Sequence, residues 1–180
     1  MLLLRSLLIF SAAWLLVFAT WITRVDAADT ESIYNPRHSY DFGAYGATFL
    51  PYRIAGVTEI VPGWGFLAAI PTAKGVFELA TFLGRGNGIN YDSVAVDYRY
   101  DIPFNTLETH ALAGVNADTY ASDTLTKSFV GGWHFGGGVS MQLGGPIFLR
   151  SDFRYRLGPG LSLLVTVGLD IRLPEGGSAN

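Results

Sequence analysis

Apolar and polar residues alternate along much of the chain, most regularly in the segment IFLRSDFRYRL from Ile147 to Leu157. Its charged residues occupy every second position from Arg150 to Arg156, and most of the residues between them are apolar. A repeat of two residues is the period of a β-strand, because successive side chains of a strand point to opposite faces of the sheet. The segment therefore predicts a strand with one apolar face and one charged face.

Seven further segments between residues 40 and 173 have the character of strands and are separated by turn residues. Their lengths lie around the roughly 9 to 11 residues that a tilted strand needs to cross a bilayer, and short connections alternate with mostly longer ones. We therefore predict an all-β fold, an eight-stranded antiparallel transmembrane β-barrel with short periplasmic turns. The predicted strands are Tyr40–Leu50, Val61–Ile70, Gly75–Leu83, Ile89–Tyr100, Leu107–Asp118, Phe129–Leu143, Ile147–Leu157 and Leu161–Leu173.

The polar faces of these strands carry equal numbers of acids and bases. Charges in a narrow interior of low dielectric must be paired, whereas a sheet facing water needs no such balance. The interior of an eight-stranded barrel is just wide enough for side chains to fill it. We predict a packed lumen, not an open pore, with a structural ion-pair network formed by Glu78, Asp97, Arg99, Glu108, Arg150, Asp152, Arg154, Arg156, Asp170 and Arg172.

Glycines and aromatic residues fall on opposite faces of the predicted strands. Small residues on the polar face are expected to leave room for the arginines. These glycines are Gly63, Gly65, Gly114, Gly132, Gly136, Gly138 and Gly168. On the apolar face, the aromatic residues are expected to meet lipid, several of them near the membrane interfaces. They are Trp64, Tyr98, Tyr100, Trp133, Phe135, Phe153 and Tyr155.

Composition favours a membrane location and excludes several classes of function. Apolar residues make up 49% of the chain and charged residues 15%, well below the roughly 25% charged residues of a typical soluble protein. Beyond the N-terminus no run approaches the roughly 20 apolar residues of a membrane helix. A net charge of -3 without a basic cluster gives no sign of nucleic-acid binding. The chain has no cysteine for a thiolate site, and we expect neither a cofactor nor a metal ion.

The N-terminal residues have the features of a secretory signal. Arg5 supplies a basic region, Leu7–Ala19 an apolar core, and the residues before Ala28 a cleavage site. We predict a signal peptide over residues 1–27, a short polar lead over 28–39, the barrel over 40–173 and a C-terminal tail over 174–180. An uncleaved helical anchor is the alternative. Either N-terminus implies export, and with the barrel it predicts passage through the periplasm to the outer membrane.

Two stretches resemble a known group of proteins. The segment from Gly131 to Leu173, GGWHFGGGVSMQLGGPIFLRSDFRYRLGPGLSLLVTVGLDIRL, is similar to the closing hairpins of the small outer-membrane β-barrel proteins, the OmpA/OmpX-like group. FGAYGATFLP, from Phe42 to Pro51, resembles their opening strand. Such barrels usually end on an aromatic residue, whereas here Leu173 is followed by PEGGSAN. The resemblance implies outer-membrane lipid, lipopolysaccharide and the barrel-assembly machinery as partners; it does not identify a specific protein partner.

Candidate catalytic residues do not form a catalytic pattern. His134 and Ser140 would lie roughly 20 Å apart on one strand, and His110 with Glu108 lacks a nucleophile. We therefore expect no enzymatic activity. The first functional hypothesis is a structural or interaction barrel that makes contacts through exterior loops, chiefly Pro51–Glu59 and Asp118–Lys127. The alternatives are a barrel that transports or binds a small solute or hydrophobic ligand and a soluble lipocalin-like binder.

Overall fold

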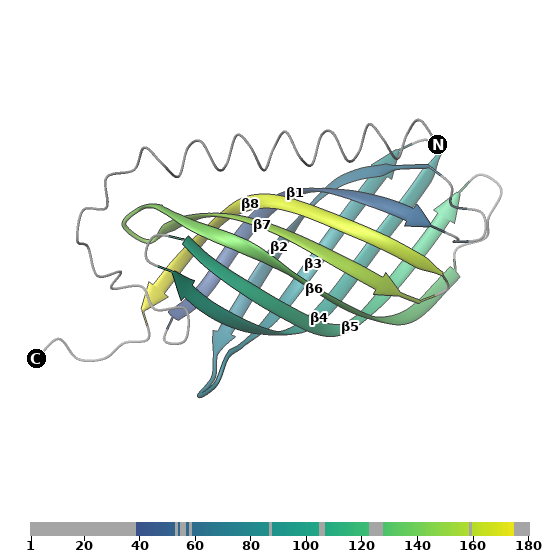
Figure 1. Ribbon diagram of the computed structural model, residues 1–180. Coiled ribbons are helices and arrows are strands. Elements are labelled where there is room, and N and C mark those ends of the chain that lie inside the picture. Colours follow the sequence, from purple (N-terminus) through teal and green to yellow (C-terminus); the bar gives the residue numbers. More distant parts are fainter. Residues whose placement is uncertain are drawn as a thin grey trace, which may run out of the picture. The chain divides into compact units, whose positions relative to one another are not determined.

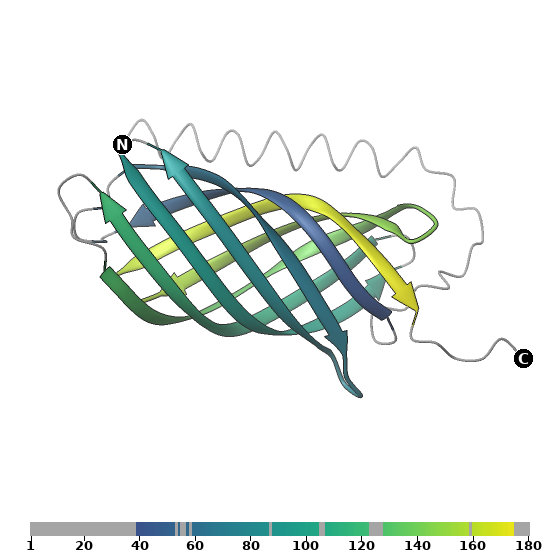
Figure 2. The ribbon, with the colours of Figure 1, turned by 180° about the vertical axis from the view of Figure 1, so that it is seen from behind.

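The strands of the computed structural model follow one another around a closed antiparallel barrel in chain order (Figures 1 and 2). The structure describes residues 39–52, 54, 57, 59–86, 88–104, 107–122, 128–158 and 160–174. The predicted signal peptide, and all but one residue each of the predicted lead and tail, lie outside the described residues. The strands are β1 (Ser39–Tyr52), β2 (Val61–Pro71), β3 (Val76–Gly86), β4 (Ile89–Phe104), β5 (Leu107–Ser122), β6 (Ser128–Gly144), β7 (Ile147–Leu157) and β8 (Leu161–Pro174).

The eight-stranded antiparallel fold predicted from the sequence is confirmed, and the barrel closes without a free edge. Strand β1 pairs with β8 over its whole length, from Ser39 opposite Pro174 to Tyr52 opposite Leu161. Closure gives every strand a paired neighbour on both sides, which a sheet in lipid requires because no water is there to bind an open edge. No helix in the described part of the chain is long and apolar enough to cross a membrane.

Several strands are longer than the alternation predicted. Strand β4 continues through Asp101 to Phe104, in a segment predicted to be a turn, and β5 continues to Ser122. The predicted exterior loop Asp118–Lys127 is therefore wrong in its first part, because Asp118 and Tyr120 are strand residues with buried side chains. Both extensions keep the period of two residues, and their inward side chains find polar partners inside the barrel.

The barrel has two different ends, which we call the turn end and the loop end. The turn end, at the left in Figure 1, contains the start of β1, the end of β8 and the connections after β2, β4 and β6. These connections are short. After β6, Gly145 adopts a positive φ of 52°, which glycine tolerates without strain, and its carbonyl accepts a hydrogen bond from Gln142 Nε2 at 2.8 Å. The loop end contains the connections after β1, β3, β5 and β7.

Side chains alternate between the outside and the inside along every strand. In β7 the exposed or half-buried residues include Leu149, Phe153 and Tyr155, and the buried ones include Arg150 and Arg154. The outside is apolar and the inside carries the charges, which is the reverse of a soluble sheet protein.

Candidate functional site

The lumen holds the ten residues of the predicted ion-pair network. Each is buried, with at most 4% of its surface exposed, and each takes part in at least one ion pair. They come from β3, β4, β5, β7 and β8. Because these strands lie on different sides of the barrel, long arginine side chains cross the lumen to reach their partners.

Glu78 is the centre of this network. Its carboxylate accepts hydrogen bonds from Arg99 Nη1 at 2.9 Å, Arg150 Nη1 at 2.7 Å and Arg154 Nη2 at 2.7 Å. The three arginines come from β4 and β7, whereas Glu78 lies in β3. Charge-assisted hydrogen bonds of this kind are stronger than neutral ones. One carboxylate therefore ties together strands on opposite sides of the barrel.

Two arginines, Arg99 and Arg172, make further contacts toward the turn end. Arg99 donates to Asp41 at 2.5 Å and to Asp101 at 2.9 Å. Arg172 donates to Glu108 at 2.5 Å, and its guanidinium carbon lies 3.8 Å from the centre of the Phe148 ring. A cation over an aromatic face is attracted by the ring quadrupole. The lumen near the turn end thus contains charged side chains and the Phe148 ring, which stabilises the charge of Arg172.

The two buried histidines lie beside carboxylates. His110 Nε2 is 2.7 Å from Asp152 Oδ1. His134 is hydrogen-bonded through Nε2 to Asp97, and its Nδ1 lies 3.1 Å from Asn116 Oδ1. Each histidine therefore contacts an acid from another strand, and neither is hydrogen-bonded to a serine among the described residues.

The lumen contains more acids than the sequence predicted. Asp41, Asp101 and Asp118 are also buried, so the described interior holds eight carboxylates and five arginines. The predicted balance of five acids and five bases is therefore wrong. These acids were missed because Asp41 lies in a segment whose faces are weakly marked, Asp101 lies in a predicted connection, and Asp118 lies at the predicted boundary between a strand and a loop. The spacing of Asp101 from Asp97 and Arg99, all at every second position, is the signal that could have found it.

The glycines of the polar face lie close to groups of neighbouring strands. Their nearest side-chain neighbours are carboxylates, an amide, a histidine and aromatic rings, not arginines. A Cβ at Gly138 would lie 2.7 Å from His110 Nε2, and one at Gly65 would lie 2.7 Å from the Tyr45 ring.

The loop end of the lumen is apolar, which the sequence did not predict. Tyr91 stacks on Tyr120 with ring centres 4.7 Å apart, and Phe49 lies 4.1 Å from Tyr91. Phe82 packs against the same group with its ring centre 5.5 Å from that of Tyr91. Seven strands each contribute one inward residue near this end. We call this group the loop-end seal, and its members are Phe49, Val61, Phe82, Tyr91, Tyr120, Val130 and Leu164.

Arg156 joins the two halves of the lumen. It lies near the loop end of β7, the strand that contributes no residue to the loop-end seal. Its Nη1 donates to Tyr91 Oη at 2.5 Å, to Ser93 Oγ at 2.7 Å and to Asp118 Oδ1 at 3.2 Å. The charged network is thereby attached directly to the aromatic rings above it.

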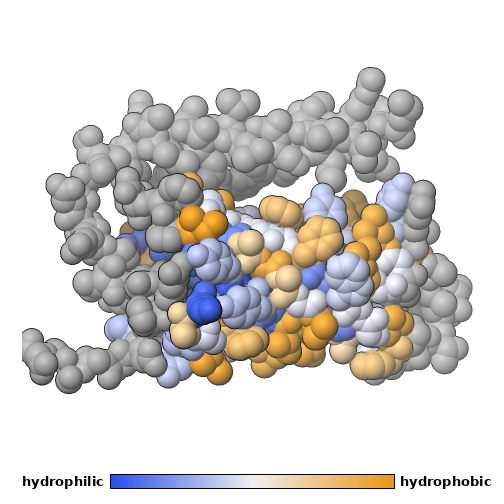
Figure 3. Space-filling view, turned by 60° about the horizontal axis from the view of Figure 1, so that its bottom comes forward, coloured by the Kyte–Doolittle hydropathy of each residue, from blue (hydrophilic) through white to orange (hydrophobic). Residues whose placement is uncertain are grey.

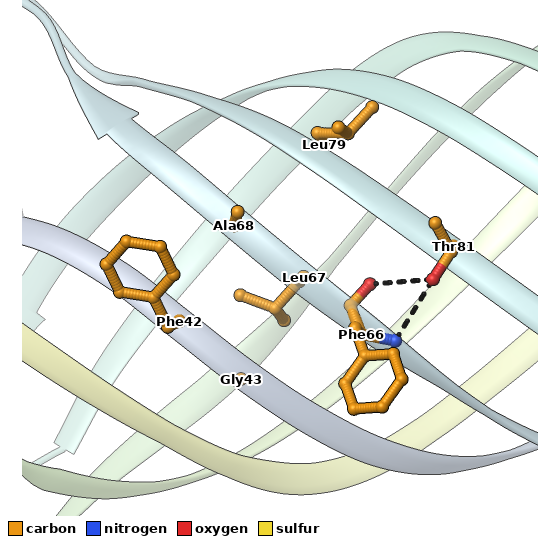
Figure 4. Close-up of a pocket in the computed structure, with 7 residues that line it drawn as sticks. All are labelled: Phe42, Gly43, Phe66, Leu67, Ala68, Leu79 and Thr81. Carbon is orange, nitrogen blue, oxygen red and sulfur yellow. Dashed lines mark hydrogen bonds between the residues drawn. The ribbon is translucent and has the colours of Figure 1, made fainter.

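The outer wall is almost entirely apolar. Large hydrophobic side chains are exposed along all eight strands, including the seven aromatic residues predicted to face lipid, and Figure 3 shows them spread over the visible wall. A shallow groove on this wall lies between Phe42, Phe66 and Leu79 (Figure 4). Its hydroxyl, Thr81 Oγ1, accepts a hydrogen bond from Phe66 N and donates to Phe66 O. The hydroxyl in this groove is thus bonded to the neighbouring backbone, while the exposed Arg85 and Asp92 pair with each other.

The sequence has no match among protein-family models, and it has none among curated proteins. Solved structures are similar to it. The N-terminal β-barrel domain of Pseudomonas aeruginosa OprF matches with a TM-score of 0.61 and 12% identity over 76% of this chain and 98% of that chain. This chain has the fold of the small outer-membrane β-barrels.

Two further structures show the same fold. Neisserial surface protein A matches with a TM-score of 0.55 and 12% identity, covering 76% of this chain and 97% of that one. Ail, the attachment invasion locus protein of Yersinia pestis, matches with a TM-score of 0.52 and 11% identity, covering 75% and 97%. The resemblance to the OmpA/OmpX-like group seen in Phe42–Pro51 and Gly131–Leu173 is confirmed for the fold.

Proposed function

We propose that this protein is an integral outer-membrane barrel with a closed lumen, which serves as an anchored scaffold and makes contacts through its loop end. The observation that carries this proposal is the inverted distribution of side chains. Thirteen charged side chains are buried in the described lumen, while 26 large hydrophobic side chains are exposed on the outside. Water would penalise such a wall, whereas lipid chains accept it.

The filled lumen favours a scaffold over a transporter. The network and the loop-end seal leave the inward side chains of all eight strands packed against one another. Contacts with other molecules then fall to the outer wall and the connections. On this proposal, lipid and lipopolysaccharide surround the wall, and the barrel-assembly machinery inserts the chain. The buried histidines and acids are structural and have no catalytic role.

Cell fractionation combined with gel mobility tests the proposal. We expect the chain in the outer-membrane fraction, extracted only by detergent, with a folded form whose mobility differs from that of the boiled form. A soluble periplasmic protein would be the control for leakage between fractions. Recovery of the folded protein in the aqueous fraction without detergent would overturn the proposal.

A further inference from the structure

The loop-end seal closes the lumen with apolar groups from almost the whole circumference. Phe49, Val61, Tyr91 and Leu164 have no exposed surface, and they come from β1, β2, β4 and β8. An ion that leaves water to enter an apolar layer loses its hydration without compensation. Narrow apolar constrictions of this kind exclude water and ions by dewetting.

The charged half of the lumen is a weaker barrier than the seal. Within the described part of the chain, several of its buried polar atoms make no hydrogen bond, including Asp41 Oδ1, Asp170 Oδ2 and Arg154 Nε. Buried polar groups in native proteins are satisfied by protein atoms or by ordered water. This half therefore suits water, whereas the loop-end seal offers water almost no partners.

We propose that the loop-end seal is the hydrophobic barrier that keeps the lumen closed to ions, which we call the gate, and that Arg156 is the positioning residue that holds its rings in place. This inference rests on the proposed function, since a gate has a meaning only in a barrel that crosses a membrane. Arg156 contacts both a ring hydroxyl of the seal, in Tyr91, and an acid, Asp118. The second stacked ring is tied to the same acid, because Tyr120 Oη donates to Asp118 Oδ2 at 3.3 Å. An ion can pass the gate only if the Tyr91 and Tyr120 rings move away from Arg156 and Asp118, which breaks these bonds.

Conductance in planar lipid bilayers tests where the barrier lies. The refolded barrel is expected to pass almost no current, and Phe49→Ser and the double variant Phe49→Ser/Leu164→Ser are expected to pass steady current. Phe148→Ser is the matched control, because Phe148 is an equally buried aromatic residue inside the turn end. We expect it to behave as the unaltered protein. Gel mobility of unboiled samples first establishes that each variant is folded.

A second pair of variants tests the role of Arg156. Arg156→Met keeps most of the side-chain volume but loses the bonds to Tyr91, Ser93 and Asp118. Its mean current is expected to rise at least tenfold, because the loss of even one charge-assisted hydrogen bond from the closed state corresponds to about that factor. Arg150→Met is the matched control on the same strand, where the arginine contacts Glu78 and Asp152 but no ring of the loop-end seal. It is expected to lower stability without raising the current.

Three results would overturn the gate. They are an unaltered barrel that already conducts steadily, folded seal variants that stay closed, and a Phe148→Ser or Arg150→Met variant that conducts as much as its partner. The second and third results leave the proposed function intact, because each is measured on a protein already inserted in lipid. Steady current through the unaltered barrel would also overturn the closed lumen, but not the membrane location. Failure to fractionate with the membrane would instead overturn the proposed function.

Discussion

The two halves of the lumen are filled by opposite chemistry within one wall. Toward the turn end, Glu78, Asp41 and the arginines around them form a network in which each charge needs a partner from another strand. Toward the loop end, Phe49, Tyr91 and Leu164 pack without any charge of their own. Burial of apolar groups is favourable whatever the neighbour, whereas a buried charge is tolerable only with its own partner.

This difference predicts which single substitutions lower the stability of the barrel most. In the charged half, removal of one group leaves several others unpaired, so the loss spreads through the network. In the apolar half, removal of one side chain leaves a cavity whose cost is local. The following variants test that contrast, in order of decreasing expected effect on the free energy of unfolding in lipid vesicles.

Glu78→Ala is expected to have the largest effect. It leaves three buried arginines without their shared carboxylate, and breaking a buried ion pair from one side costs about 3–5 kcal/mol. Urea unfolding measured by fluorescence gives the difference. Glu59→Ala, an exposed carboxylate near the loop end, is the control and should stay within about 0.5 kcal/mol. Equal stability of the two variants would show that the network does not hold the barrel together.

Leu164→Ala removes a fully buried member of the loop-end seal. We expect a loss of about 2–5 kcal/mol, from the transfer of the lost groups and from the cavity they leave. Leu169→Ala is the control on the same strand, where the leucine is exposed and lipid chains can fill the space. The same urea titration compares them. A loss at Leu169 as large as that at Leu164 would show that the loop end is not tightly packed.

Val167→Arg places an arginine on the outer wall, whereas the arginines of the native protein that lie in the lumen are paired with acids. Val167 is exposed near the middle of β8, and an arginine at the bilayer midplane costs about 2–4 kcal/mol. Leu173→Arg, near the end of the same strand, should cost about 0–1 kcal/mol because an interface is within its reach. Equal effects at the two positions in vesicle unfolding would show that the wall does not lie across a bilayer.

The bond between the two halves can be measured by a double-mutant cycle. Arg156→Met and Tyr91→Phe remove the two ends of one hydrogen bond, and we expect a coupling energy of about 0.5–3 kcal/mol. Arg150→Met with Tyr91→Phe is the control cycle, since no hydrogen bond joins that pair, and it should be additive within about 0.5 kcal/mol. An additive first cycle would mean that Arg156 does not connect the halves.

Two serine variants should give the smallest effects and separate the wall from the lumen. Ser151→Ala removes an outward hydroxyl that donates to the Thr166 carbonyl at 3.1 Å, and we expect a change within about 0.5 kcal/mol. Ser93→Ala removes an inward hydroxyl that accepts from Arg156, which keeps Tyr91 and Asp118 as acceptors, and we expect a loss of about 0.5–1.5 kcal/mol. A larger loss of stability for Ser151→Ala than for Ser93→Ala in urea unfolding would contradict the conclusion that hydrogen bonds inside the lumen contribute more to stability than those on the wall.

The fold could be predicted almost completely from the sequence. The number of strands, and the face on which Arg150, Arg154, Phe153 and Tyr155 lie, follow from the alternation itself. The candidate site could be predicted in part. Asp41, Asp101 and Asp118 were missed because the pattern fades near strand ends, where the boundary between a strand and a turn depends on contacts with distant residues. The apolar loop end was missed because large apolar residues such as Phe49, Val61 and Leu164 occupy inward positions there, so the two faces of a strand no longer differ in polarity.

The alternation along each strand specifies which side chains point inward, because the side of a strand on which a residue lies is a local property of an extended chain. Which inward side chains contact one another depends on the folded barrel. Glu78 contacts Arg150 and Arg154, which are 72 and 76 residues away in the chain. Along the barrel axis, the charged network and the loop-end seal occupy different halves of the lumen. These meetings depend on the stagger between strands in the closed barrel. No single strand specifies that stagger, because it arises only when β1 pairs with β8.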